Sequence, residues 1–520
     1  MIPVTRFSPR VASWIVLAAI RSAAVLGIEA YDVTVEVDVA AGLPAWTIVG
    51  LASSAVKEAR ERVTAAIANS GFALPSRRVT VNLSPADVRK DGTAFDLPIA
   101  LGLLSATGQL DAAALDGLLV AGELGLDGSI RPIRGALPLA RSAARSSVRA
   151  LVIPEGNTAE AMLVTSARLA TAPTLRALVD ALRAGALPPA VSPPVRSGTP
   201  PDALDFADVI GQPVAKRALE IAAAGSHNVL LVGPPGAGKT MLARRLPGIL
   251  PALDEAALLE VVAVHSVGGL LPPGTYPSRT PPFRAPHHTI SMAGLIGGGP
   301  GPRPGEVSLA HRGVLFLDEM LELPRHVLDA MRQPLEDGRV VIARAAHAVA
   351  YPARFQLIGA CNPCPCGKSG DPNAICSCSA VDIERYGARL SGPLADRIDL
   401  HAHVGAVALS ALGAVNTEER SESVRARVEA ARERQRARYA SLTGTQTNAD
   451  VPGRWLLAHG GITTSARLVL EQAADRLHLS ARGYHRALRV ARTIADLDGA
   501  DDVPDAAVAE ALRFRNRGAA

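Results

Sequence analysis

Aromatic side chains are scarce in this sequence, and long apolar runs are missing. Phe, Trp and Tyr account for 3% of its 520 residues, so the hydrophobic cores must consist mainly of Ala, Leu and Val. No stretch reaches the roughly 20 apolar residues that a membrane-spanning helix needs, which argues against a membrane protein and favours a cytoplasmic one. The net charge is also weak, at +5. Such a charge permits a nucleic-acid partner without requiring one.

Cysteine is also rare, and its distribution argues against a disulfide framework. Four of the five cysteines form one cluster, which is more typical of a metal site. The four are Cys364, Cys366, Cys376 and Cys378. Four thiolates on a loop of this size can surround a structural Zn²⁺ tetrahedrally, with free thiols or a redox-labile pair as the alternatives. Because the cluster follows Asn362 directly, a metal here would brace that residue's loop, whereas Cys361 is expected to be a small buried residue.

The first 20 residues predict no domain of their own. Arg6 and Arg10 precede the apolar stretch Val11–Ile20, a pattern similar to a short signal peptide but without an A-x-A-like cleavage site. We therefore interpret residues 1–20 as an extension or as the product of a translation start placed too early.

A proline-rich stretch divides the remaining chain. Residues 21–186 alternate β-rich runs with helical ones, which predicts an α+β domain. Residues 187–204 hold six prolines among Ser, Gly and Ala and predict a stiff, extended linker. A second domain over 205–412 and a helical segment over 413–515 follow.

A phosphate-binding loop lies early in the second domain. The apolar strand Asn228–Val232 leads into a G-x-x-x-x-G-K-[ST] sequence, and Met241–Leu246 continues as a helix, which is the context that this motif requires. The loop consists of Gly233, Pro234, Pro235, Gly236, Ala237, Gly238, Lys239 and Thr240. Its glycines let backbone N–H groups point at the phosphates. Lys239 is expected to reach the β- and γ-phosphates of ATP, and the Thr240 hydroxyl to hold Mg²⁺.

Two further strands end in polar residues that complete such a site. Gly313–Leu317 is a buried strand followed by Asp318, expected to orient Mg²⁺, and by Glu319, expected to polarise the attacking water. Asn362 follows the apolar strand Arg354–Ala360 and would lie between the other two motifs, where it could bond to the γ-phosphate or the water. A turn-forming Asn before Pro is the plainer alternative.

Arginines downstream are candidates for stabilising charge during phosphoryl transfer. Arg397 is our candidate for an arginine supplied to a neighbouring subunit, which implies a ring; a salt bridge to Asp396 or Asp399 is the alternative. Ser480 predicts the start of a helix over Ala481–Leu497. Arg482 and Arg486 share one face of that helix, and one of them could fold over the nucleotide, unless they form a solvated basic face.

The chain resembles the ComM/YifB family of magnesium-chelatase-like AAA+ ATPases, from about Arg21 to about Arg515. The stretches that carry the resemblance are Gly42–Gly50, Val81–Asp87, Phe283–Thr289, Pro304–Ala310 and Tyr484–Arg486. Members of the family usually begin near Arg21, which supports the misplaced start.

The resemblance implies an α/β multidomain fold in three parts. These are an N-terminal Lon-protease-like α+β domain, a central AAA+ P-loop domain with a parallel α/β sheet, and a C-terminal helical lid. It further implies a homo-hexameric ring in which Asp318 and Glu319 form the Walker B motif, Asn362 is sensor 1, Arg397 the arginine finger and Arg482 sensor 2. Arg486 is close enough to replace Arg482 in that role.

A protease activity of the Lon type is not expected. The resemblance places the nucleophilic Ser within a Lys-Asp-Gly-x-Ser stretch, and here Lys90–Thr93 is followed by Ala94. Without that hydroxyl there is no acyl intermediate by this route. We do not expect Thr93 to act in its place. The domain is better suited to assembly or to DNA contact.

Three residues are candidates for DNA contacts. Arg284 begins a loop that continues through His287–His288 to a Gly-rich run, although that His pair could equally hydrogen bond within a packed loop. Val340–Tyr351 predicts a β-hairpin carrying Arg344 and His347, and the equivalent hairpin of MCM-like motors faces the channel. The basic helix over Arg425–Arg438 is explained as well by an exposed face.

The family likeness implies a DNA translocase that migrates branches during recombination in natural transformation, with recombination proteins as further partners. A protein-remodelling, chelatase-type ATPase without a DNA substrate is the alternative. DNA stimulation of ATP hydrolysis separates the two.

Overall fold

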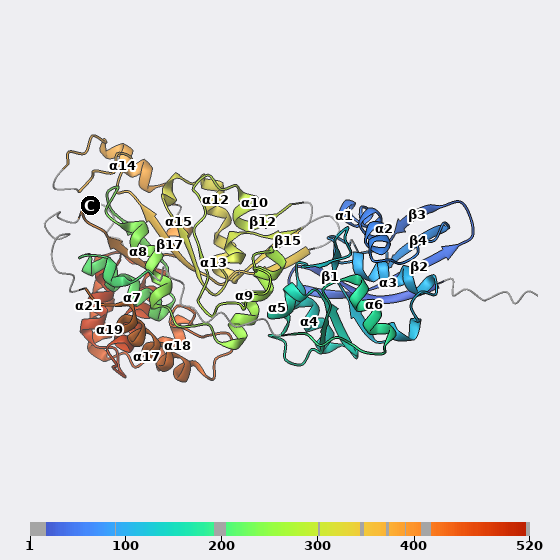
Figure 1. Cartoon of the computed structure of the whole chain (residues 1–520). Coiled ribbons are helices and arrows are strands. Elements are labelled where there is room, and N and C mark those ends of the chain that lie inside the picture. Colours follow the sequence, from blue (N-terminus) through green and yellow to red (C-terminus); the bar gives the residue numbers. More distant parts are fainter. Residues whose placement is uncertain are drawn as a thin grey trace, which may run out of the picture. The chain divides into compact units, whose positions relative to one another are not determined.

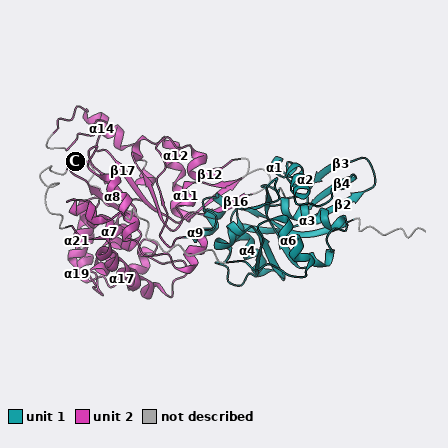
Figure 2. Cartoon of the chain, in the orientation of Figure 1, with its two compact units in different colours: residues 1–197, 262–277 teal, residues 198–261, 278–520 magenta. Residues whose placement is uncertain are grey.

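The computed structural model describes residues 17–88, 90–191, 204–299, 302–343, 348–370, 374–390, 392–406 and 418–515. The chain divides into two compact units (Figure 2), one comprising 1–197 with 262–277 and the other 198–261 with 278–520. No helix among the described residues is long and apolar enough to cross a membrane.

The first unit is built on a seven-stranded mixed sheet in the order β3-β4-β2-β1-β5-β8-β9 (Figure 1). Its strands are β1 (Leu17–Leu26), β2 (Glu29–Ala40), β3 (Ala45–Val49), β4 (Arg78–Ser84), β5 (Leu118–Val120), β8 (Ala150–Ile153) and β9 (Leu169–Thr171). The pairs β1–β2 and β2–β4 are antiparallel, whereas β5, β8 and β9 run parallel. A small hairpin of β6 (Glu123–Leu124) and β7 (Ile130–Arg131) lies beside it.

Helices cover both faces of this sheet because its central strand is apolar on both sides. Ala23 and Ala24 of β1 are both buried but contribute to different hydrophobic clusters. Helix α3 packs on one face and is buried along its whole length, and α4 lies in the other cluster. The helices are α1 (Ser54–Lys57), α2 (Ala59–Asn69), α3 (Asp96–Ala106), α4 (Ala136–Arg145), α5 (Thr158–Ala161) and α6 (Leu175–Arg183).

The boundaries of this unit differ from the predicted ones at both ends. Strand β1 begins at Leu17, and Ile20 is buried, so residues 17–20 belong to the sheet and not to an extension. At the other end the Pro188 carbonyl accepts a hydrogen bond from Thr171 N–H at 3.2 Å. The start of the proline-rich stretch is therefore held by the first unit, and residues 192–203 lie outside the described residues.

The second unit contains a five-stranded parallel sheet in the order β11-β14-β17-β10-β18. Its strands are β10 (Val229–Val232), β11 (Phe283–Arg284), β14 (Val314–Leu317), β17 (Gln356–Cys361) and β18 (Leu400–His403). Two hairpins accompany it, β12 (Gly297–Gly298) with β13 (Arg303–Pro304) and β15 (Arg339–Ala343) with β16 (Ala348–Pro352). The predicted hairpin over Val340–Tyr351 is thus confirmed.

Helices surround this sheet, and the C-terminal ones gather beside α7 (Figure 1). Those of the central part are α7 (Pro213–Gly225), α8 (Lys239–Arg245), α10 (Met292–Ile296), α11 (Glu306–Leu309), α12 (Arg325–Ala330), α13 (Arg332–Asp337), α14 (Ala380–Gly387) and α15 (Gly392–Ala395). Helix α9 (Glu255–Gly268) is divided between the two units, with residues 262–268 in the first. Those that follow are α17 (Ser421–Tyr439), α18 (Gly453–His459), α19 (Thr464–Arg476), α20 (Ala481–Leu497) and α21 (Asp505–Arg513). Helix α20 has the predicted bounds, and Ser480 caps it by accepting from Gly483 N–H.

The C-terminal helices do not form a separate compact unit. Val428 of α17, Leu488 of α20 and Val508 of α21 belong to the same hydrophobic cluster as Leu231 of β10. We predicted a helical segment from residue 413, and its described part, 418–515, consists mainly of helices. The apolar faces of these helices complete one core with the central sheet.

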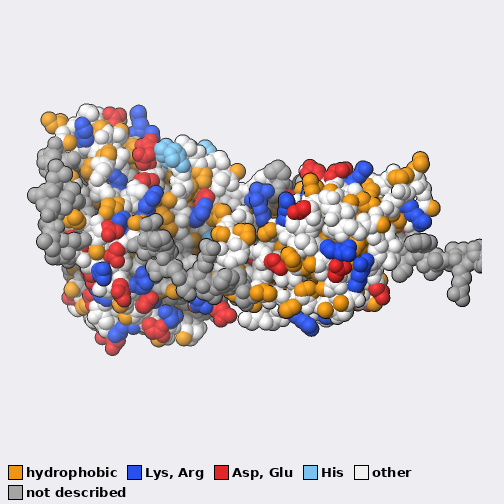
Figure 3. Space-filling model, in the orientation of Figure 1, with side chains coloured by type: hydrophobic (Ala, Val, Ile, Leu, Met, Phe, Trp, Pro, Cys, Tyr) orange, Lys and Arg blue, Asp and Glu red, His pale blue; other side chains and the backbone are white. Residues whose placement is uncertain are grey.

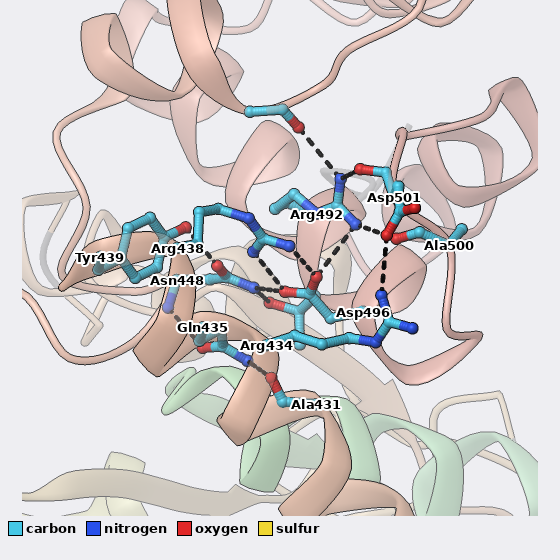
Figure 4. A network of polar contacts seen from close by, with 12 residues as sticks. Ala431, Arg434, Gln435, Arg438, Tyr439, Asn448, Arg492, Asp496, Ala500 and Asp501 are labelled. Atoms are coloured by element: carbon cyan, nitrogen blue, oxygen red, sulfur yellow. Dashed lines mark hydrogen bonds and ion pairs between the residues drawn. The ribbon is translucent and has the colours of Figure 1, made fainter.

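A buried polar network fixes α17 against α20 (Figure 4). The Asp496 carboxylate accepts from Arg438 Nη1 at 2.9 Å, from Arg492 Nη2 at 3.0 Å and from Asn448 Nδ2 at 2.8 Å. The side chains of Arg492 and Asp496 are both 0% exposed. Burial lowers the pKa of Arg492. The Asp496 carboxylate balances the charge of this buried guanidinium group and pairs with that of Arg438, which is 17% exposed.

Replacing Asp496 by Ala should therefore be strongly destabilising. Removing one partner of a buried ion pair typically costs about 3–5 kcal/mol because the remaining charge is left uncompensated. The measurement is urea unfolding followed by tryptophan fluorescence, since Trp455 contacts the Tyr439 ring of α17 at 5.4 Å between centroids. The matched control is Asp498→Ala at the end of the same helix. Asp498 is 56% exposed and 3.4 Å from Arg217, and such a pair contributes about 0–1 kcal/mol. Equal losses in the two variants would contradict the prediction.

Candidate active site

The loop Gly233–Thr240 follows β10 and leads into α8, as the motif predicts. Two of its glycines, Gly236 and Gly238, have φ of +78° and +90°, in the region that glycine adopts at low cost. Gly233 is required by packing, because a Cβ there would lie 2.1 Å from the Val404 carbonyl oxygen. The loop therefore owes its course to glycine backbone geometry and to the neighbouring β18 segment.

Lys239 links this loop to Asn362. Its ammonium group donates to the carbonyls of Gly233 at 2.6 Å and Pro234 at 2.9 Å, and to Asn362 Oδ1 at 3.1 Å. Lys239 is buried, and desolvation lowers its pKa. A phosphate that displaced these neutral acceptors would supply the negative charge that the buried ammonium group lacks.

Thr240 and the carboxylates after β14 meet beside the same loop. The Thr240 hydroxyl donates to Asp318 Oδ2 at 2.6 Å, and Asp318 Oδ1 accepts from Glu319 N–H at 3.0 Å. Glu319 has φ of 47° and ψ of 43°, a left-handed conformation that costs a non-glycine residue about 1–2 kcal/mol.

His288 contacts Glu319, and the sequence did not predict this contact. His288 Nδ1 lies 3.1 Å from Glu319 Oε2, and its ring lies 4.1 Å from that of His287. His287 in turn bonds to Thr289 Oγ1 at 2.9 Å. The adjacent histidines were the available signal, since we expected them either within a packed loop or at DNA.

The strand order explains why these residues come together. β17 lies between β14 and β10, so Asn362 follows the strand that separates Asp318–Glu319 from the phosphate-binding loop. Parallel strands present their carboxyl ends at one edge, where open α/β sheets bind ligands. The position of Asn362 between the two motifs is as predicted, whereas its role stays a prediction.

The three downstream arginines form a group of their own. Arg397 Nη2 pairs with Glu336 Oε2 at 2.6 Å, and not with Asp396 or Asp399 as the alternative had it. Arg486 donates to the carbonyls of Ala395 at 3.2 Å and Ile398 at 2.8 Å, and its Nη2 reaches Asp396 at 3.1 Å.

Arg482 is more exposed and lies 3.9 Å from Asp396. The contacts of Arg482 and Arg486 are thus with the segment around Arg397, and none of them is with the phosphate-binding loop. Arg486 supports that segment structurally, which neither candidate role had anticipated.

Nearly the whole chain is similar to known proteins. Residues 205–412 match the family described as magnesium chelatase, subunit ChlI; residues 418–515 match its C-terminal family; and residues 35–157 match the family described as subunit ChlI of Mg-chelatase. Competence protein ComM of Haemophilus influenzae is 44% identical over 508 residues, covering 96% of this chain and 97% of its own.

The chain belongs to the ComM/YifB family of magnesium-chelatase-like proteins.

Two other relatives support this membership. YifB of Escherichia coli is 42% identical over 509 residues, covering 96% of this chain and 97% of its own. An uncharacterised protein of Mycobacterium tuberculosis is 46% identical over 499 residues, covering 96% of this chain and 98% of its own. A mixed α/β fold with a parallel sheet suits a family of AAA+ type, which suggests an ATPase that uses ATP and Mg²⁺.

The candidate DNA contacts of this ComM/YifB chain have different outcomes. Arg284 forms a bidentate ion pair with Glu306, Nε to Oε2 at 2.6 Å and Nη2 to Oε1 at 2.8 Å, so its charge is neutralised within the second unit. Arg344 and His347 lie outside the described residues. The strands that lead to them alternate buried and exposed residues, with Val340 and Tyr351 buried.

The basic helix α17 is exposed on one side only. Arg436 is 62% exposed and pairs with Glu433 of the same helix, as an exposed face would have it, whereas other arginines contact neighbouring segments. Arg427 pairs with Glu220 at 2.6 Å, and Arg432 donates to the Ala223 carbonyl at 2.7 Å. Arg425 donates to the Gly248 carbonyl at 2.8 Å. These arginines tie α17 to α7 and to the segment after α8, which periodicity alone could not reveal.

The four clustered cysteines could hold a metal ion. Their sulfur atoms all lie within 4.8 Å of one another, and Cys364 Sγ lies 3.4 Å from Cys366 Sγ and 3.7 Å from Cys376 Sγ. Backbone N–H groups of Lys368 and Ser377 donate to Cys366 and lower its pKa to about 5. Cys361 is buried, as predicted, and burial raises its pKa to about 12.

The side chains of Lys90 and Thr93, in the stretch compared above with Lon-type enzymes, each have a hydrogen-bond partner. The Lys90 ammonium donates to the Pro85 carbonyl, and the Thr93 hydroxyl donates to Glu123. Thr93 and Lys90 are thus not hydrogen-bond partners of each other, and Ala94 follows.

Proposed function

We propose that this protein is a cytoplasmic, ATP-driven ring motor of the magnesium-chelatase/MCM-like AAA+ group that moves along DNA. The observation that carries the ATPase proposal is the meeting of Lys239, Thr240, Asp318, Glu319 and Asn362 at one edge of the parallel sheet. Such a motor would act as a homo-hexamer, because Arg397 would serve the nucleotide of a neighbouring subunit.

In this proposal each residue has a defined task. Lys239 exchanges its three neutral acceptors for phosphate oxygens, and Asn362, released from it, orients the γ-phosphate or the water. Glu319 accepts the proton of the attacking water. Thr240 Oγ1 and Asp318 Oδ2, 2.6 Å apart, suit the hydroxyl and carboxylate environment of Mg²⁺, which would neutralise charge on the β- and γ-phosphates.

The DNA part of the proposal is supported by the relationship to a competence protein along 96% of the chain. We infer a branch-migration role in recombination during natural transformation, with recombination proteins as partners. Basic and acidic side chains are interspersed over the described part of the visible face (Figure 3). This part of the face therefore offers no large basic patch to support DNA binding. We propose Arg344 and His347, which lie outside the described residues, as DNA contacts, whereas the Arg284–Glu306 pair weighs against Arg284.

DNA should stimulate ATP hydrolysis by this protein if the proposal holds. A four-way junction is expected to raise the steady-state rate, and the stimulation should fall with salt because phosphate contacts release counterions. The control is Glu319→Gln, in which no DNA should restore the rate. A rate unchanged by any DNA would exclude the translocase and favour the protein-remodelling alternative, to be pursued by trapping a client with the same variant.

We further propose Zn²⁺ as the ion of the four-cysteine cluster. Tetrahedral Zn²⁺ with bonds of about 2.3 Å requires sulfur atoms about 3.8 Å apart. The observed separations of 3.4, 3.5 and 3.7 Å among Cys364, Cys366 and Cys376 are near this value. Because all four positions would be filled by protein, such a site is structural and not catalytic.

A further inference from the structure

The cysteine cluster is in contact with the phosphate-binding loop. The turn Cys364–Gly367 is closed by a hydrogen bond from Gly367 N–H to the Cys364 carbonyl at 2.9 Å. A Cβ added to Gly367 would lie 2.6 Å from Cδ and 2.9 Å from Cγ of Pro235. The backbone of the cysteine turn is thus packed directly on the second proline of the loop Gly233–Thr240.

The same turn is linked to the Lys239 ammonium group through Asn362. Asn362 lies two positions before the turn, and the Gly367 Cβ position is 3.8 Å from Asn362 Cγ. Asn362 Oδ1 accepts from Lys239 Nζ at 3.1 Å. The turn is therefore placed to position both Pro235 and Asn362.

Few apolar side chains are buried among the described residues of the loop, 364–370 and 374–378. Cys364 is buried, but Cys366, Cys376 and Cys378 are partly exposed, and Ile375 is 91% exposed. Burial of apolar side chains therefore contributes little to the order of these described residues. Bonds to a metal can, because the free energy of metal binding becomes folding free energy where no preformed core exists.

We propose that the four-cysteine metal site is a positioning element of the nucleotide site, which holds Pro235 and Asn362 through the turn Cys364–Gly367. This inference rests on the proposed ATP and Zn²⁺ binding. It predicts that loss of the metal lowers the affinity for ATP, although no cysteine touches the nucleotide. A displacement of the turn would then also displace Pro235 and Asn362.

Two glycine variants of the full-length protein distinguish the contact of the turn with Pro235, which we call the brace, from metal binding by the cysteines. Gly367→Ala keeps all four cysteines but pushes a methyl group against Pro235. Gly370→Ala is the matched control, because Gly370 lies in the same loop with nearly the same φ, +76° against +78°, and nothing lies within 4 Å of its Cβ position. Cys376→Ser removes a ligand. For each protein we would measure zinc per chain by atomic absorption and the Kd for a fluorescent ATP analogue.

The expected pattern differs among the three. The wild type and both glycine variants should contain about one zinc per chain, as a single site of four thiolates requires. Gly367→Ala should raise the Kd for the analogue by about tenfold or more, and Gly370→Ala should leave it near the wild-type value. Cys376→Ser should lose zinc and raise the Kd as well.

A double-mutant cycle distinguishes the contact of Gly367→Ala with Pro235 from a general folding defect of that variant. Pro235→Ala removes the Cγ and Cδ atoms that the new methyl group meets. The effect of Gly367→Ala should therefore be much smaller in a Pro235→Ala background, since contacting residues couple energetically. A defect of equal size in both backgrounds would overturn the brace.

The remaining outcomes each decide one part. A zinc-free wild type that binds the analogue would overturn the metal site and leave the proposed ATPase standing. If the wild type contains zinc and Gly367→Ala has the same Kd for the analogue as Gly370→Ala, the brace alone would be overturned. Wild type with zinc but without affinity for the analogue would overturn the proposed nucleotide site and the brace with it.

Discussion

Glu319→Gln should lower the rate of ATP hydrolysis by about 10²–10⁴-fold, the range typical of a lost general base. The amide cannot accept the proton of the attacking water, while its shape is nearly unchanged. Binding of ATP should persist, because the contacts of Lys239 and the pair of Thr240 with Asp318 do not involve Glu319. The measurement is single-turnover hydrolysis beside the Kd for a fluorescent ATP analogue.

The matched control for this variant is Glu322→Gln. Glu322 follows three residues later, is exposed and pairs with Arg389 at 3.1 Å, so its loss should change the rate by no more than about twofold. Lys239→Ala gives the contrasting defect, because it should abolish binding itself. Hydrolysis by Glu319→Gln at the wild-type rate would show that another group activates the water.

The contact between His288 and Glu319 adds a detail to this expectation. An imidazole 3.1 Å from the carboxylate is a polar partner that Glu319 already has. Water activation by Glu319 would have to compete with this partner. The pair comes from segments 31 positions apart, 288 and 319, so only the folded sheet brings it together.

The sequence predicted those parts of the site that local backbone chemistry determines. Gly236 and Gly238 adopt positive φ, which glycine does at low cost because it has no Cβ. Asp318 and Asn362 follow buried strands whose parallel order puts their ends at one edge. The helix from Ala481 to Leu497 begins at Ser480 because a hydroxyl acceptor satisfies its free N–H groups. The glycine conformations and the helix start depend on neighbours within a few residues, whereas the meeting of the strand ends follows from the parallel order of the sheet.

Contacts between distant segments could not be predicted in the same way. Arg397 pairs with Glu336, 61 residues away, whereas the sequence offered only the adjacent Asp396 and Asp399. The arginines of α17 resembled an exposed or DNA-binding face, but Arg427 and Arg432 contact residues more than 200 positions earlier. The contact of Gly367 with Pro235 likewise requires the folded sheet, since the two loops follow different strands.

The other large effect is expected from Arg397→Ala, and it tests the ring directly. Loss of an arginine that stabilises the transition state costs about 10³–10⁵ in rate, while ATP binding should persist because Arg397 contacts Glu336 and the Pro393 carbonyl rather than the phosphate-binding loop. The measurement is again hydrolysis beside nucleotide affinity. Arg389→Ala is the matched control, since Arg389 also pairs with a carboxylate, Glu322, on the same unit.

Mixing two inactive variants distinguishes an arginine that acts on a neighbouring subunit from one that acts within its own chain. Arg397→Ala subunits retain Glu319, and Glu319→Gln subunits retain Arg397. In a randomly mixed ring about a quarter of the interfaces would combine an intact nucleotide site with an intact arginine, so hydrolysis should reappear. Rescue of this kind would require Arg397 to exchange Glu336 for the neighbour's nucleotide. Persistent inactivity of the mixture, with intact oligomers, would place the role of Arg397 inside its own chain, where the bond to Glu336 holds the segment that Arg486 supports.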